Sequence, residues 1–266
     1  MPMLGIMASQ ISGHLSVAFN TDFLVLAGGG GTAASAEQSG GGGAGGMRCS
    51  VTATGGGGTL EAVLAVATGT NYSVTVGAGG GVTANGSNSI FSTKTATGGG
   101  QGGTRSTGGS NGGSGGGAGD FSGTPGGTGT ANQGFNGGLG GSGGTGDAGG
   151  GGGGAGSVGL APTSSTGGAA GNGVASSITG SSVTYGQGGT GGDAPSGSAS
   201  PANSGKGGDS GPHPTVYAGG SGVVILRYAD TRTITIGAGL TGTESSPSGG
   251  YKRATITAGT GNVSWA

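Results

Sequence analysis

Glycine recurs at every third position through the middle of this chain, and this spacing restricts the fold more than any other feature. From Gly134 the sequence reads GFN-GGL-GGS-GGT-GDA-GGG-GGG, with glycine at 134, 137, 140, 143, 146, 149 and 152. Three residues per turn is the repeat of an extended, left-handed polyproline-II-type helix. Glycine at each third place lets two such backbones lie directly against each other, because no Cβ atom separates them. The spacing predicts packed polyglycine-II-type helices, with a disordered glycine linker as the alternative.

The overall composition bears on these two alternatives. Glycine accounts for 80 of the 266 residues, only 6% of the residues are charged, and the formal net charge is -1. Disordered chains usually remain soluble through charge, which this chain lacks. Because glycine loses more conformational freedom on folding than other residues, a folded state requires dense main-chain hydrogen bonding, at about 1 kcal/mol net per bond. Packed glycine helices would supply it.

Four regions can be distinguished along the chain. Residues 1–27 form an N-terminal docking arm and a first strand, and residues 28–97 alternate glycine runs with strands. Residues 98–220 are expected to form the polyglycine-II helix bundle with its loops, and residues 221–266 a C-terminal β unit. The fold class expected is irregular and mostly β, a bundle of polyglycine-II-type helices flanked by short antiparallel strands. Essentially no α-helix is expected beyond a turn at the N-terminus.

Strands are expected where β-branched and aromatic residues alternate or cluster between glycine runs. These segments are 22–26, 59–66, 71–76, 89–95, 222–228, 232–236 and 252–257.

Five segments in order resemble a glycine-rich module of bacteriophage tail-fibre proteins, and the resemblance covers roughly residues 22–228. They are FLVLAGGGG, GGGGAGGMR, YSVTVGAGG, SSITGSSVTYGQGG and GGSGVVILRY. In layout the chain is also similar to the distal adhesin of long tail fibres in T-even-type phages. That resemblance implies a polyglycine-II sandwich, an N-terminal region docked on the fibre, and loops that contact a host receptor. The C-terminal segment from residue 232 has no counterpart in that layout.

The same resemblance implies a location and partners. The protein would belong to the virion, in the tail fibre outside the cell. Its partners would be a tail-fibre shaft protein or copies of itself, and a host outer-membrane protein or surface glycan. The N-terminal segment has no basic region and does not read as a signal peptide. Its apolar residues either pack on their own domain or dock onto the fibre: Leu4, Ile6, Met7, Ile11 and Leu15.

Bulky side chains in the glycine-rich part are the candidates for receptor binding. They are too large to enter tightly packed helices, so they either cap helix ends or form a binding surface, in which aromatic anchors usually carry the affinity. For Tyr185 the packing interpretation is favoured. The prolines on either side of His213 stiffen that loop and lower the entropy lost on binding. The six candidates are Phe121, Phe135, Leu160, Tyr185, His213 and Tyr217.

Nothing in the sequence indicates catalysis or a cofactor. The GxGxxG matches are those that a glycine-rich chain produces by chance, and the two histidines stand in no metal-ligand spacing. Cys49 is alone, so an intrachain disulfide is excluded. Eight basic residues scattered over the chain form no patch for nucleic acid, and no apolar run is long enough to insert into a membrane. We expect a non-enzymatic adhesin without cofactor or metal; the alternative is a self-assembling structural filament or virion decoration protein that binds no receptor.

Overall fold

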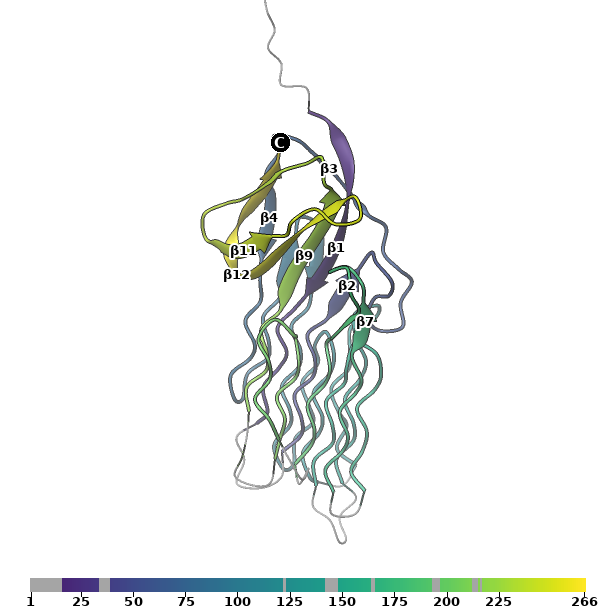
Figure 1. Ribbon diagram of the computed structural model, residues 1–266. Coiled ribbons are helices and arrows are strands. Elements are labelled where there is room, and N and C mark those ends of the chain that lie inside the picture. The colour runs from purple at the N-terminus through teal and green to yellow at the C-terminus, as the bar shows by residue number, and fades with distance from the viewer. Residues whose placement is uncertain are drawn as a thin grey trace, which may run out of the picture.

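The computed structural model describes residues 16–33, 39–121, 123–141, 148–163, 166–192, 197–211, 215 and 217–266. In this part of the chain the strands gather at one end of the molecule, and long glycine-rich segments run away from them side by side (Figure 1). The strands are β1 (Ala18–Leu26), β2 (Met47–Cys49), β3 (Leu64–Ala67), β4 (Tyr72–Thr75), β5 (Ser89–Phe91), β6 (Lys94–Ala96), β7 (Val174–Ser176), β8 (Val183–Tyr185), β9 (Val223–Ala229), β10 (Ile234–Ile236), β11 (Leu240–Glu244) and β12 (Tyr251–Trp265).

One antiparallel sheet contains all of these strands except the β7–β8 hairpin. Its main order is β2-β1-β9-β12-β4-β5-β6; in addition, β3 pairs with β1, and β10 and β11 pair with β12. The strands at the two ends of that order, β2 and β6, contact each other, so the sheet is nearly closed and barrel-like. No described residue is helical. The expectation of a mostly β fold with short antiparallel strands is confirmed.

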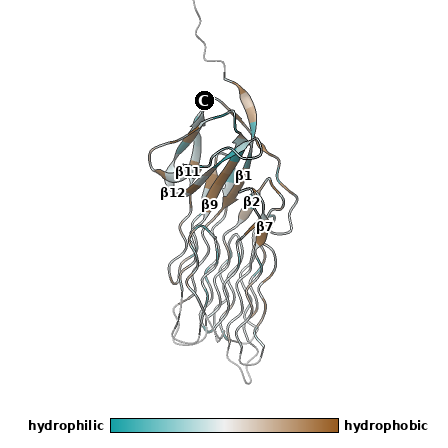
Figure 2. Cartoon of the chain, in the orientation of Figure 1, coloured by the Kyte–Doolittle hydropathy of each residue, from teal (hydrophilic) through white to brown (hydrophobic). Residues whose placement is uncertain are grey.

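The central strands of the barrel are apolar on both faces. Phe23 and Val25 of β1 point into the barrel core, whereas Leu24 and Leu26 belong to a second cluster on the outside of the sheet. That second cluster includes Ile178 and Tyr185 from the β7–β8 region. Strands buried on both faces read as continuous apolar runs, and the apolar colour in Figure 2 accordingly concentrates on the strands.

Several expected strands have different bounds in the structure. The segment 59–66 is a strand only from Leu64 on, because residues 59–62 form a loop in which Glu61 turns to contact Arg48. The segment 89–95 is a hairpin of β5 and β6, and 252–257 is part of the 15-residue β12. The strands expected at 71–76, 222–228 and 232–236 are confirmed as β4, β9 and β10.

The glycine-rich segments are joined by main-chain hydrogen bonds that repeat every three residues. We call these segments, where described, the glycine slab: residues 27–46, 76–88, 97–173 and 185–222. In segment 39–46, the N–H groups of residues 40, 43 and 46 donate to carbonyls in 97–103, at 2.7–2.9 Å. The N–H groups of residues 41 and 44 donate to the carbonyls of residues 150 and 153. The N–H groups of residues 42 and 45 donate to the carbonyls of residues 208 and 205.

The carbonyl groups of the same segment follow the same period. Residues 41 and 44 accept from 117 and 114, residues 39 and 42 accept from 192 and 189, and residues 43 and 46 accept from 30 and 27. Segment 39–46 is thus surrounded by six neighbouring segments, three that accept its N–H groups and three that donate to its carbonyls. Main-chain pairing of this density satisfies the polar backbone groups that burial would otherwise leave unpaired.

Close packing in the slab requires glycine at many positions. A Cβ atom built on Gly41 would lie closer than 3.0 Å to the backbone of Gly189, and one on Gly42 would meet the backbone of Gly30 and Gly208 in the same way. Real Cβ atoms essentially never approach backbone atoms so closely. The neighbouring backbones occupy the space that any side chain would need.

Asparagine side chains take the place of a neighbouring carbonyl at the outer surface of the slab. The Oδ1 atom of Asn85 accepts from Gln101 N at 2.8 Å, and that of Asn111 accepts from Thr128 N at 2.8 Å. The Oδ1 atom of Asn136 likewise accepts from Gly129 N at 2.9 Å. All three asparagines are exposed. The outermost segments are therefore capped by side chains at these points.

Candidate functional site

The candidate residues lie at different heights along the slab, which can be read from the hydrogen-bond register. Segment 39–46 reaches the barrel at Gly46, just before β2, so Ser39 lies toward the opposite, far end. Gly117 N bonds to Gly41 O, and Phe121 follows four residues farther along the same direction. Tyr217 O accepts from the N–H of Thr32, six residues beyond the end of β1. Phe121 and Tyr217 therefore belong to the far end of the slab.

Two other candidates lie at or near the barrel. Phe135 bonds through its backbone to Gly115 and Gly154, close to the barrel end, and its ring packs beneath Gly57. Tyr185 ends β8 and is only 7% exposed, inside the second apolar cluster. Burial raises the pKa of its hydroxyl. Neither residue shares a surface with Phe121.

Leu160 and Phe121 lie on two segments that both bond to a third, and this third segment carries an exposed residue that the sequence did not single out. Segment 113–121 bonds to segment 133–141, and segment 133–141 bonds to segment 156–163. These three adjacent segments carry Phe121, Leu139 and Leu160, which are 57%, 52% and 54% exposed. We call these three side chains the apolar outer patch. Leu139 lies inside the run of glycine triplets, as the third residue of the triplet GGL at 137–139.

The remaining candidates lie outside the described residues. These are His213 and the five residues of the N-terminal arm, Leu4, Ile6, Met7, Ile11 and Leu15.

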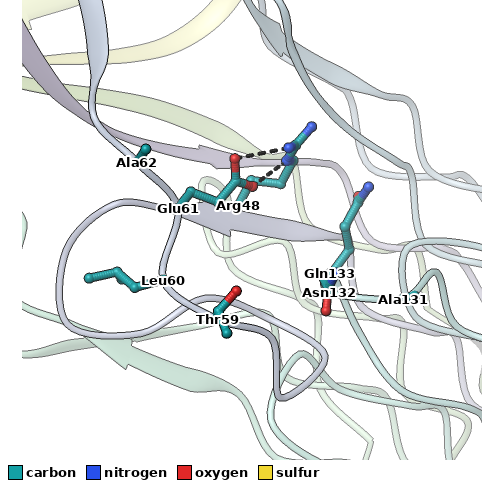
Figure 3. Close-up of a pocket in the computed structure, with 8 residues that line it drawn as sticks. All are labelled: Arg48, Thr59, Leu60, Glu61, Ala62, Ala131, Asn132 and Gln133. Carbon is teal, nitrogen blue, oxygen red and sulfur yellow. Dashed lines mark hydrogen bonds and ion pairs between the residues drawn. The ribbon is translucent and has the colours of Figure 1, made fainter.

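A pocket opens where the barrel meets the slab. Its volume is about 440 Å³, and Figure 3 shows that its walls come from β2, from the loop before β3 and from a turn of the slab. Neither its position nor its residues were predicted from the sequence. The lining residues are Arg48, Thr59, Leu60, Glu61, Ala62, Ala131, Asn132 and Gln133.

A cluster of three charges borders this pocket. Arg48 donates to both carboxylate oxygens of Glu61, through Nε to Oε1 and through Nη2 to Oε2 at 2.9 Å. Lys94 Nζ lies 2.8 Å from Glu61 Oε2. Burial by itself would raise the pKa of Glu61, but the hydrogen bonds from Arg48 and Lys94 outweigh it, and the pKa lies below its usual value. The carboxylate is therefore ionised at neutral pH.

We expect Glu61 to make the stability of the protein sensitive to acid. Because its pKa is lower in the folded state than the ordinary 4.5, its contribution is complete above pH 4.5. That contribution is lost as the pH falls from 4.5 through the folded-state pKa. Urea unfolding at a series of pH values should show a midpoint that decreases in this window, and Glu61→Gln should flatten this part of the decrease. A profile of the Glu61→Gln variant as steep as that of the wild type would contradict the assignment.

The described residues offer no evident centre for metal or thiol chemistry. They contain no group of three or more histidine, cysteine or acidic side chains placed to hold a metal ion. Cys49 is buried, burial raises the pKa of its thiol, and its Sγ lies 3.2 Å from the carbonyl oxygen of Val51. A buried thiol with a raised pKa is a poor nucleophile. No helix with the length and apolarity to cross a bilayer occurs in this part of the chain.

Comparison with known proteins gives one result. The family model described as a glycine-rich domain matches residues 14–229, which include the slab and the strands from β1 to β9. No curated protein and no solved structure gives a match.

Proposed function

Since the chain belongs to the glycine-rich domain family, which spans residues 14–229, we propose that it is a non-enzymatic attachment protein. In this proposal the barrel anchors the chain, the glycine slab is a rigid scaffold, and exposed side chains on the slab bind a host cell-surface receptor. The resemblance to phage tail fibres suggests a fibre tip as its place and an outer-membrane protein or surface glycan as its receptor.

The three-residue hydrogen-bond period is the observation that carries the proposal. It matches the three residues per turn of a polyproline-II-type helix, so we infer that the slab segments are packed polyglycine-II helices. A scaffold held by its main chain places no demand on outward-facing side chains. Those side chains are then available for recognition, as Phe121, Leu139 and Leu160 are.

The apolar outer patch supports a binding role for exposed side chains of the slab. In a chain with few bulky side chains, three of them stand more than half exposed on adjacent segments. Apolar side chains that gather on a surface often mark an interaction site. A receptor protein, or the apolar face of a sugar, suits this chemistry.

The asparagine caps favour attachment over self-assembly into a filament. A growing lattice would need free N–H groups and glycine on its outer segments, so that another chain could approach. At the outer surface Asn85, Asn111 and Asn136 instead occupy N–H groups with their own side chains. Natural sheets protect their edges from unwanted pairing by comparable means.

Adsorption to cells tests the proposal. Labelled protein is mixed with a panel of Gram-negative bacteria, and bound label is counted for the wild type and for the Phe121→Ala/Leu139→Ala/Leu160→Ala variant. We expect the variant to lose about 100-fold or more of its binding, since apolar anchors contribute on the order of 1–2 kcal/mol each. Val63→Ala, which removes a 41% exposed side chain near the barrel, is the control and should bind normally. Adsorption of the triple variant at the wild-type level would rule out the patch.

A further inference from the structure

The pocket between barrel and slab has the size and chemistry of a ligand site. Its volume of about 440 Å³ lies within the range of roughly 300–1,000 Å³ that small-molecule pockets occupy. Arg48, Glu61 and the side-chain amides of Asn132 and Gln133 give it a polar lining, and Leu60, which is 50% exposed, adds an apolar surface (Figure 3).

The walls of the pocket are fixed by hydrogen bonds that do not involve a ligand. Glu61 N donates to Cys49 O at 3.1 Å, which ties the loop to β2. Met47 N donates to Gln133 O at 3.0 Å, and Gln133 Oε1 accepts from Thr97 N at 2.8 Å. A pocket that is already formed loses little conformational entropy when a ligand binds.

The charges at the pocket favour an anionic group. Arg48 and Glu61 line the pocket, and Lys94, which is not part of the lining, pairs with Glu61, so the cluster of three charges has a net charge of +1. A guanidinium group has five N–H donors. Two nitrogens of Arg48 bond to Glu61, and the third lies 3.4 Å from Thr95 O. Donors therefore remain for a carboxylate, whose geometry arginine matches well.

The other wall is suited to hydroxyl groups. Asn132 has a positive φ of 61°, and among the described residues its side-chain amide has no hydrogen-bond partner. An amide offers both donors and acceptors, as a ring of hydroxyl groups requires. Leu60 supplies an apolar surface for the C–H face of such a ring.

We propose that this pocket binds a carboxylated sugar. Arg48 receives the carboxylate, Asn132 and Gln133 bond to ring hydroxyl groups, and Leu60 packs against the apolar face. This site is separate from the apolar outer patch and does not depend on it.

Calorimetric titration of the intact protein tests the proposal, with D-glucuronic acid as the probe and D-glucose as the uncharged counterpart. We expect saturable binding of glucuronate and binding of glucose weaker by about tenfold, because hydrogen bonds to charged groups contribute roughly 1.5–3 kcal/mol. Equal affinity for both sugars, or no saturation by glucuronate, would overturn the proposal. The methyl glycoside of glucuronic acid separates two sources: if it also binds, the ligand is a residue of a glycan, and if only the free acid binds, the ligand is the free sugar.

Two substitutions assign the binding to this pocket. Asn132→Gly removes the amide and keeps the positive φ, which glycine adopts readily, and Leu60→Ala removes the apolar wall. Each should weaken glucuronate binding by about fivefold, as expected for the loss of roughly 1 kcal/mol, without changing the unfolding temperature by much. Val82→Ala, which removes a 37% exposed apolar side chain outside both the pocket and the apolar outer patch, should leave the affinity unchanged. Wild-type affinity in both pocket variants would place the sugar elsewhere.

Discussion

Replacing Gly42 with alanine should disrupt the glycine slab at its centre. A Cβ atom at this position would lie closer than 3.0 Å to the backbone of Gly30 and Gly208, which belong to two different neighbouring segments. Overpacking usually costs about 1–3 kcal/mol when side chains can adjust. Here only backbones can move, and each is bonded to further segments, so we expect a loss of about 3 kcal/mol or more. Denaturant unfolding followed by circular dichroism measures it.

Gly81→Ala is the matched control for this experiment. Gly81 lies in the same glycine-rich slab, but a Cβ atom built on it meets nothing within 4 Å. The free energy of unfolding of this variant should lie within about 0.5 kcal/mol of the wild-type value, as is usual for surface substitutions. If Gly42→Ala were equally harmless, the slab could not be the close-packed lattice described above.

Replacing Trp265 with alanine should destabilise the barrel about as strongly. Trp265 is the last residue of β12 and is 2% exposed. Its ring meets those of Phe19, Tyr72 and Tyr228 edge-on, with centroids 5.7, 5.8 and 5.7 Å away. Removing a buried tryptophan costs about 3–5 kcal/mol, and the loss of these aromatic pairs contributes to that cost. We expect a large decrease in the unfolding midpoint measured by calorimetry.

Tyr251→Ala serves as the control for the tryptophan variant. Tyr251 begins the same strand but is 39% exposed. Its ring contacts Arg227 at 4.8 Å, an exposed cation–π contact of about 0.5–1 kcal/mol. The tyrosine variant should therefore lose no more than about 1 kcal/mol. Similar losses in the two variants would show that Trp265 does not hold the core together.

Strands were predictable where the side chains of a segment show a pattern. They were less predictable where contacts with residues far away in the sequence determine whether a segment forms a strand. The apolar run at 222–228 and the alternation at 71–76 were enough to predict β9 and β4. By contrast, β2 is a strand because Met47, Arg48 and Cys49 pair with β1. The start of the strand predicted at 59–66 is a loop instead, because Glu61 is held by Arg48 and Lys94. A local pattern contains no information about those partners.

The candidate surface was predictable only in part, for a related reason. Bulky residues in a glycine-rich segment are conspicuous, and Phe121 and Leu160 are indeed both more than half exposed, on segments that each bond to segment 133–141. Tyr185, for which the sequence favoured the packing interpretation, is buried against the sheet. Leu139 escaped notice although it is 52% exposed. Exposure depends on which face of a segment meets a neighbour, and the chain alone does not say which segments are neighbours.

The glycine spacing alone therefore predicted that extended segments in close contact would build the middle of this chain, with a disordered linker as the alternative, since the absence of a Cβ atom is a local property. It also showed that main-chain hydrogen bonds would have to stabilise the fold, because few side chains can be buried. Only the tertiary structure decided that β1, β9 and β12 join in one nearly closed sheet and that segment 39–46 has six neighbours. The pocket beside Arg48 likewise arises from segments far apart in the sequence. One glycine run looks like another in the sequence, so the sequence does not identify which segments lie side by side. The contacts of the whole fold, formed together, determine the neighbours of each segment.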